Sequence, residues 1–162
     1  MKTLALVFSF AALAAASQTP ALAESGQDEI VVSPARAMED WRQSISRNLN
    51  RHLDNAVERL GSAPDSGIVQ LRFKLDEAGR PVAMQTYRSS GSLAGDRAAR
   101  WAVRRLDGLD RGPVARTPDT VFQANIIFAG SRAERLELAD RLAWMERERL
   151  ARGDTAVVAL GL

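Results

Sequence analysis

Hydrophobic and polar positions along this chain follow different periods in different stretches, and each period predicts a different element. Between Met38 and Leu60 the apolar residues recur at spacings of three and four, which predicts an amphipathic helix with one face turned to a core. Pro34 suits the first turn of such a helix, and Gly61 marks its C-terminal end. The apolar positions are Met38, Trp41, Ile45, Leu49, Leu53, Ala56, Val57 and Leu60.

In three later stretches, apolar and polar residues alternate along the chain. Residues 67–76 place Val69, Leu71, Phe73 and Leu75 on one side, which predicts a half-buried strand. A weaker alternation over 81–88, after a turn containing Gly79, completes an antiparallel hairpin. A third strand is predicted over 121–129.

Two more helices complete the predicted fold. One covers about 93–106, and the other runs from a cap at Ser131 to about 152. The apolar stripe expected on the last helix is Leu136, Ala139, Leu142, Ala143 and Leu150. We therefore expect an α+β domain of order α-β-β-α-β-α, in which a short three-stranded antiparallel sheet is packed by helices on one face. Residues 155–160 form an apolar tail with the composition of a short strand.

The N-terminus has the three zones of an export signal. Lys2 is followed by an apolar run over 4–16, and then by Ala21 and Ala23, small residues at the positions that signal peptidase reads. An uncleaved anchor would need about 20 apolar residues, and this run is shorter and ends at Pro20. Residues 1–23 are therefore predicted to be a cleaved signal peptide, and the expected location is the bacterial periplasm.

Composition narrows the class of protein. There is no cysteine, which excludes disulfides and a lipid-modified cysteine anchor. No second apolar stretch reaches spanning length, so the mature protein is expected to be soluble. The net charge is +2 with acidic and basic residues interleaved, which argues against nucleic acid as a partner.

One family matches the order of these features. The alternating strand with its Asp76-to-Gly79 turn, the Ser89-Ser90-Gly91 that ends the second strand, and the Asp96-Arg97-Ala98-Ala99 helix resemble the TonB C-terminal domain. The resemblance covers about 90 residues, from Trp41 to Phe128. The chain then divides into a lead (24–36), the TonB-like domain (37–130), a C-terminal helix (131–153) and an apolar tail (154–162).

The resemblance implies a protein-binding module. TonB captures an extended receptor segment as an added strand beside the last strand of its domain, so the implied partner is a protein or peptide of the cell envelope, such as an outer-membrane receptor. The anchor and the long Pro-rich spacer of the energy transducers are missing here, so energy transduction by this chain alone is not expected. The partner-binding residues implied are Val121, Phe122, Gln123, Ala124, Asn125, Ile126 and Ile127.

The sequence contains no convincing motif for catalysis or metal binding. His52 is the one histidine and has no cysteine or second histidine to complete a zinc site. Ser89-Ser90-Gly91 lacks the context of a nucleophile and is interpreted as a turn. Trp41, Trp101 and Trp144 are interpreted as core or core-edge residues. No enzyme activity, cofactor or metal is predicted.

An alternative function remains open. The C-terminal helix could mediate self-association, which would make the protein a homodimeric structural or assembly component of the envelope. A further hypothesis concerns the 121–128 strand, which carries no charge and no proline. Because such an edge invites aggregation, we expect the 155–160 tail, or the helix before it, to pack over or beside it.

Overall fold

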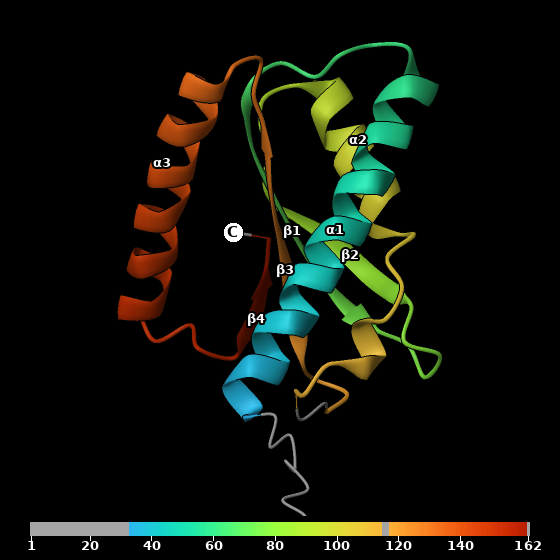
Figure 1. The fold of residues 1–162 in the computed structure, drawn as a ribbon, viewed down its shortest axis with the longest axis vertical. Helices are drawn as coiled ribbons and strands as arrows, with labels where there is room; N and C mark the ends of the chain where they lie inside the picture. Colours follow the sequence, from blue (N-terminus) through green and yellow to red (C-terminus); the bar gives the residue numbers. More distant parts are fainter. Residues whose placement is uncertain (1–32, 115–116, 162) are drawn as a thin grey trace, which may run out of the picture. The chain divides into compact units, whose positions relative to one another are not determined.

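A computed structural model describes residues 33–114 and 117–161, which lie within one compact unit (Figure 1). The predicted signal peptide lies outside the described residues. Within the described ranges, no helix is long and apolar enough to cross a membrane. The elements are α1 (Pro34–Leu60), β1 (Gly67–Leu75), β2 (Pro81–Arg88), α2 (Leu93–Val103), η1 (Leu109–Arg111), β3 (Val121–Phe128), α3 (Arg132–Ala151) and β4 (Val157–Leu160).

Local sequence determines where the helices begin and end. The side chain of Ser33 accepts a hydrogen bond from the backbone N–H of Arg36, and Pro34 opens the first turn of α1. Gly61 ends α1 in the left-handed conformation, with φ of 63°. Ser92 and Ser131 cap α2 and α3 in the same manner as Ser33. The predicted first-helix end and the Ser131 cap are therefore confirmed.

The sheet has one strand more than predicted. Its order is β2-β1-β3-β4, with β1 antiparallel to both β2 and β3. β4 is formed by the apolar tail and pairs in parallel with β3. The prediction of a three-stranded antiparallel sheet is thus wrong in strand number and direction, because α3 carries the tail back along the sheet before it pairs.

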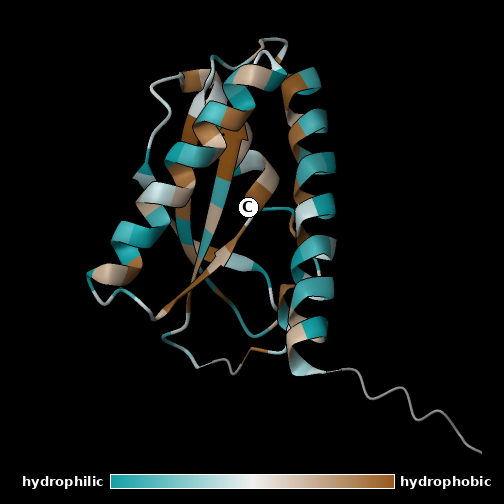
Figure 2. Cartoon of the chain, turned by 60° about the vertical axis from the view of Figure 1, so that its left-hand side comes forward, coloured by the Kyte–Doolittle hydropathy of each residue, from teal (hydrophilic) through white to brown (hydrophobic). Residues whose placement is uncertain are grey.

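Both faces of the sheet are covered. α1 and α2 pack on one face and α3 lies on the other, so the helices are not on a single face as expected (Figure 1). The face toward α1 and α2 carries the apolar core. There Phe73 of β1 stacks on Phe122 of β3, with ring centroids 5.8 Å apart. In Figure 2 the strands carry much of the hydrophobic colour, and α1 is largely hydrophilic along its outward side.

Trp41 of α1 packs in this core and contacts the segment around η1. Its indole Nε1 donates a hydrogen bond of 3.0 Å to the carbonyl of Gly108. The ring lies so close to Gly112 that a Cβ there would come within 2.5 Å of it. The buried core residues are Trp41, Ile45, Leu49, Val69, Leu71, Phe73, Ala99, Ala102, Val103, Leu106, Leu109, Phe122, Ala124, Ile126 and Leu160.

The apolar stripe predicted for α3 is wrong at two of its five residues. Leu142 is buried, but Leu136 and Leu150 are exposed. The side of α3 that faces the sheet instead buries Glu146 and Arg149. These two residues face the polar side chains of β1 and β3, so the inward side of the helix is defined by charge as well as by hydrophobicity.

Candidate strand-binding site

The candidate binding residues, Val121 to Ile127, all lie on β3, as predicted. Their side chains alternate between the two faces of the sheet. Phe122, Ala124 and Ile126 belong to the apolar core, whereas Gln123 and Asn125 are buried on the side of α3. Because these five side chains are buried, an added segment would reach β3 through its backbone.

The backbone of β3 is paired on both sides along its first half. β1 pairs with β3 from Phe128 to Phe122, and β4 pairs on the other side with Val121 to Ala124. The implied position of this strand at the sheet edge is therefore wrong for these four residues, because β4 covers them. The expectation that the tail packs beside this strand is confirmed.

The second half of β3 is less enclosed. The register with β4 ends where Ala124 lies opposite Leu160, and within the described residues no strand pairs with 125–128 on that side. Gly161 comes next, with φ of +78°, and a Cβ at this position would lie 2.6 Å from the carbonyl oxygen of Asn125. Glycine is thus required where the chain passes this carbonyl.

β4 is held by a small number of contacts. It has four residues, of which only Leu160 is fully buried, while Val158 packs at the margin of the core. In the loop before it, Asp154 forms an ion pair of 2.6 Å with Arg72 of β1. The backbone carbonyl of Asp154 also accepts a hydrogen bond from the Arg149 guanidinium. These contacts tie β4 to β1 and α3 as well as to β3.

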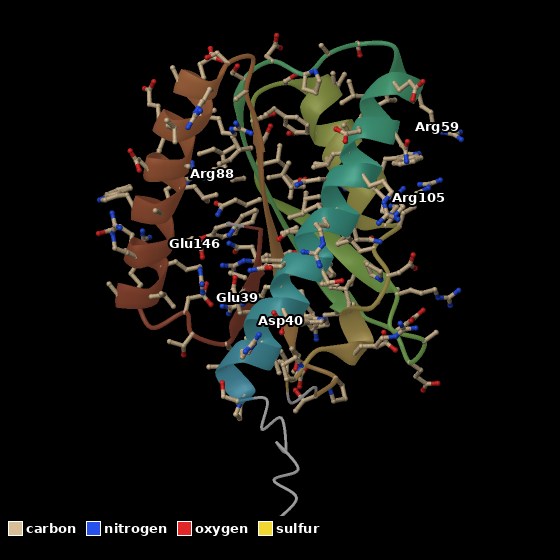
Figure 3. All side chains as sticks on the ribbon, in the orientation of Figure 1. Glu39, Asp40, Arg59, Arg88, Arg105 and Glu146 are labelled. Carbon is tan, nitrogen blue, oxygen red and sulfur yellow. The ribbon has the colours of Figure 1, made fainter. Side chains whose placement is uncertain are left out.

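A buried polar layer lies between α3 and the sheet. At its centre is the Glu146 carboxylate, which Figure 3 labels on α3 toward the sheet. Its Oε1 accepts hydrogen bonds from Gln123 (2.7 Å) and Gln70 (3.0 Å), and its Oε2 lies 2.9 Å from Nε of Arg149. Asn125 Oδ1 accepts from the same two glutamines, at 3.0 and 2.9 Å. We define the polar layer as Gln70, Gln123, Asn125, Glu146 and Arg149.

One amide in this layer is incompletely satisfied. Nδ2 of Asn125 is buried and has no hydrogen-bond partner in the described part of the chain. A buried unpaired polar group costs about 1–3 kcal/mol. Asn125 is therefore the member of the polar layer whose hydrogen bonding is incomplete.

The N-terminal end of α3 is fixed separately. The Ser66 hydroxyl donates a hydrogen bond of 2.9 Å to Glu134, and the backbone N–H of Gly130 donates another of 2.9 Å. These hydrogen bonds lower the pKa of the Glu134 carboxyl from its ordinary value of 4.5, and the bond from Ser66 has the largest effect. They favour the charged form, so the ionised carboxylate links α3 to the loop that precedes β1.

The opposite edge of the sheet is protected against strand addition. β2 begins at Pro81, and its register with β1 is interrupted twice by irregularities. Ala83 has φ of 51°, a left-handed conformation that is uncommon for alanine. Arg88 adds a charge at the end of the strand. Proline, bulges and charges are the usual means by which an edge strand avoids pairing with another chain.

The remaining candidates have structural roles. The Asp96 carboxylate accepts hydrogen bonds from the hydroxyls of Ser89 (2.6 Å) and Ser90 (3.1 Å), which holds the turn before α2. His52 lies edge-on to Trp101, which is itself half-buried. Trp144, by contrast, is 56% exposed, so its prediction as a core or core-edge residue is wrong. In the described ranges no group of three or more His, Cys, Asp or Glu side chains could hold a metal.

Arg72, Asp154 and Gly161 were not predicted as functional residues. A signal for Asp154 was present, because Gly153 and Asp154 separate the end of a helix from an apolar run, which is a helix stop followed by a strand. Arg72 occupies a polar position in the alternation of its strand. No family model, curated protein or solved structure matches this chain.

Proposed function

We propose that this protein is a soluble periplasmic binding module, similar in kind to TonB, that accepts an extended peptide segment of an envelope protein along β3. The observation that carries the proposal is the parallel pairing of β4 with Val121–Ala124. This pairing holds a short extended segment, supplied by the chain itself, where a partner segment would add. A partner would take the place of β4, and the main-chain hydrogen bonds of β3 would hold it.

Few strong contacts must break before β4 can leave β3. Leu160 is the one fully buried side chain that the strand contributes. The ion pair between Arg72 and Asp154 is partly exposed, with side-chain exposures of 24% and 34%, and pairs of this kind contribute about 0–1 kcal/mol. Asp154 would leave together with β4, so this contact would be lost in the same step.

The second half of β3 offers a place for a partner to begin. Residues 125–128 lie beyond the register of β4 on the same edge. A segment that pairs there first could extend toward Val121 as β4 withdraws. Ile126 is buried and Ile127 is half-buried, so this first contact would also be made mainly with the backbone.

The proposal can be tested by weakening β4 without changing β3. Gly161→Val introduces a Cβ against the carbonyl of Asn125, at a backbone conformation that disfavours side chains, and should release β4. A labelled peptide with the sequence of residues 154–160 serves as the probe. Because a site that is open for only a fraction of the time has proportionally lower apparent affinity, the variant should bind the peptide at least about tenfold more tightly than wild type in fluorescence anisotropy.

Gly153→Val is the matched control. Gly153 has a similar φ of +81°, but a Cβ there meets no atom within 4 Å. Its affinity for the peptide should stay close to that of wild type. Amide exchange over Val121–Ala124 should be faster in Gly161→Val alone. The proposal fails if exchange becomes faster and the peptide still does not bind. If Gly161→Val leaves exchange unchanged, Leu160→Asp provides a second way to release β4.

A second candidate function rests on the outer side of α3. Leu136 and Leu150 are 59% and 50% exposed, and half-buried Ala143 lies midway between them at seven-residue spacing. A seven-residue apolar repeat is the pattern by which two helices pack side by side. Self-association through this stripe would make the protein a structural component of the envelope.

Light scattering separates the two candidates. A dimer at micromolar concentration that Leu136→Glu converts to a monomer would favour self-association through α3. Leu93→Glu is the control, because Leu93 is 66% exposed and lies on α2. A wild-type protein that is monomeric throughout this range would exclude the second candidate and leave the first unaffected.

A further inference from the structure

A groove runs between α3 and the part of the β1–β2 hairpin where β1 begins and β2 ends. It consists of two hollows, of about 180 Å³ and about 90 Å³, both of which are lined by Arg88 and Met145. The part of α3 that lines it, from Leu138 to Arg149, rises about 17 Å, the length of about five extended residues. We name it the α3–β2 groove. Its main charged and aromatic lining residues are Tyr87, Arg88, Arg141, Trp144, Glu146, Arg149 and Arg152.

The charges of this groove do not balance. Glu146 is paired with Arg149 at 2.9 Å, and Glu148 beside the groove is paired with Arg152 at 3.5 Å. Within the described ranges Arg88 and Arg141 have no carboxylate within ion-pair distance. Figure 3 labels Arg88 between α3 and the sheet. In the described part of the chain, its guanidinium donates one hydrogen bond, of 3.3 Å, to the side chain of the neutral Gln70. Two guanidinium groups are thus left to attract an anion.

A carboxylate at one end of the groove already has hydrogen-bond partners in a turn. Asp96 lies behind the Ser89–Ser90 turn at the end of the groove, and its two oxygens accept hydrogen bonds from both serine hydroxyls and from the Ser90 N–H. Asp96 does not line either hollow. It stabilises the turn and forms no ion pair with Arg88 or Arg141.

Two exposed aromatic rings border the same groove. Tyr87 and Trp144 both line the smaller hollow, and they are 51% and 56% exposed. Tyr87 is held in position by Arg72, whose guanidinium carbon lies 3.8 Å from the centre of the ring. Aromatic residues together with arginine are the residue types most enriched where proteins bind other proteins.

We infer that the α3–β2 groove binds an acidic polypeptide segment in extended form, a site separate from the one proposed on β3. Carboxylates of the segment pair with Arg88 and Arg141, and its apolar side chains lie against Tyr87 and Trp144. A polypeptide fits better than a small anion, because the free guanidinium groups and the aromatic rings are distributed along the groove. A segment that alternates acidic and apolar residues matches this distribution.

The test uses the full chain and two labelled peptides of equal length. In one, glutamate alternates with phenylalanine, and in the other lysine replaces glutamate. The acidic peptide should bind and the basic one should not, and added salt should weaken the binding by screening. Arg141→Glu should lower the affinity about tenfold, since it removes one ion pair and adds a repulsion. Trp144→Ala should lower it as well.

Arg147→Glu is the matched control for charge. It lies on α3 and makes the same change in net charge, but Arg147 does not line the groove. Its affinity should stay within about twofold of wild type, the size expected of a distant exposed charge. An excess of unlabelled peptide with the sequence of residues 154–160, the probe for β3, should leave the acidic peptide bound. This separates the result from the outcome of the β3 experiment.

Four outcomes would overturn the inference. They are no binding of the acidic peptide, equal binding of the basic peptide, an equal loss of affinity in Arg147→Glu and Arg141→Glu, and binding to anionic lipid vesicles that is tighter than binding to the acidic peptide and that Arg141→Glu abolishes. The last would mean that the arginines meet a membrane surface. Selective binding that Arg141→Glu weakens and Arg147→Glu retains would establish the groove as a site for acidic segments.

Discussion

The two faces of the sheet are both covered by helices, but they differ in chemistry. Toward α1 and α2 the strands present Val69, Leu71 and Phe73, packed in a continuous apolar core. Toward α3 they present Gln70 and Gln123, which are joined to the helix by hydrogen bonds to Glu146. One face is held by hydrophobic burial, and the other depends largely on the completeness of a polar network.

This difference separates two parts with distinct roles. An apolar interface loses stability in proportion to the surface exposed, whereas a buried polar interface must be fully paired or it becomes unfavourable. α1, α2 and the hairpin therefore form a stable base. α3 and β4 are attached through the polar layer and a few buried apolar side chains. This side also borders both proposed binding sites.

The largest expected effect lies on the apolar face. Phe73 is 1% exposed and stacks on Phe122, so Phe73→Ala leaves a cavity that the sheet cannot close. It should lower the free energy of unfolding by about 3–5 kcal/mol. Chemical denaturation followed by circular dichroism measures this. A loss below about 1 kcal/mol would mean that the apolar face does not carry most of the stability.

Glu146→Ala tests the polar face. It leaves the buried guanidinium of Arg149 and the amides of Gln70 and Gln123 without their shared acceptor. We expect a loss of about 2–3 kcal/mol, measured in the same way. Glu146→Gln retains an acceptor oxygen and should lose less. If both variants lose equally, it is the negative charge that matters, and the hydrogen-bond network is not the main interaction.

Glu134 makes the stability of the α3 side of the sheet depend on pH. Because its pKa is lower when folded than its ordinary 4.5, its contribution is fully present above that value and is lost as the pH falls through the folded pKa. Glu134→Gln should flatten part of the decline in thermal midpoint on acidification. Asp76, whose pKa the backbone N–H of Arg80 lowers, acts with the same sign and stays in both proteins. Glu137→Gln on the same helix is the control and should decline as wild type does.

The smallest effect is expected at Trp144. Although it is a large apolar residue, it is more than half exposed, so Trp144→Ala should change the free energy of unfolding by less than about 0.5 kcal/mol. A thermal melt measures this, with Trp41→Ala as a contrasting core variant that should lose several kcal/mol. A large loss at Trp144 would show that its ring packs in the α3–β2 groove more closely than its exposure indicates.

The apolar face was predictable from the sequence because its period and its burial agree. Val69, Leu71 and Phe73 alternate with polar residues, and Trp41, Ile45 and Leu49 fall on one side of a helix. Core burial selects hydrophobic residues, so the pattern and the environment carry the same information.

The polar face could not be predicted in this way. Gln70, Gln123 and Asn125 occupy alternate positions that would be equally suitable for facing water, and hydropathy cannot distinguish the two environments. For the same reason Glu146 and Arg149 were not included in the stripe predicted to face inward on α3. β4 was suggested by its composition, but a pairing that joins residues so far apart has no local signal in a single sequence.

The parallel pairing of β3 with β4 has a consequence for folding. Leu75 and Pro81 of the hairpin are six residues apart, whereas Val121 and Val157 of the parallel pair are 36 residues apart, with all of α3 between them. Closing the longer loop costs more entropy, and distant pairings of this kind form late. Until β4 arrives, the uncharged strand 121–128 is open to other folding chains. Refolding yield should therefore decrease as protein concentration rises, although in the native protein half of this edge is covered.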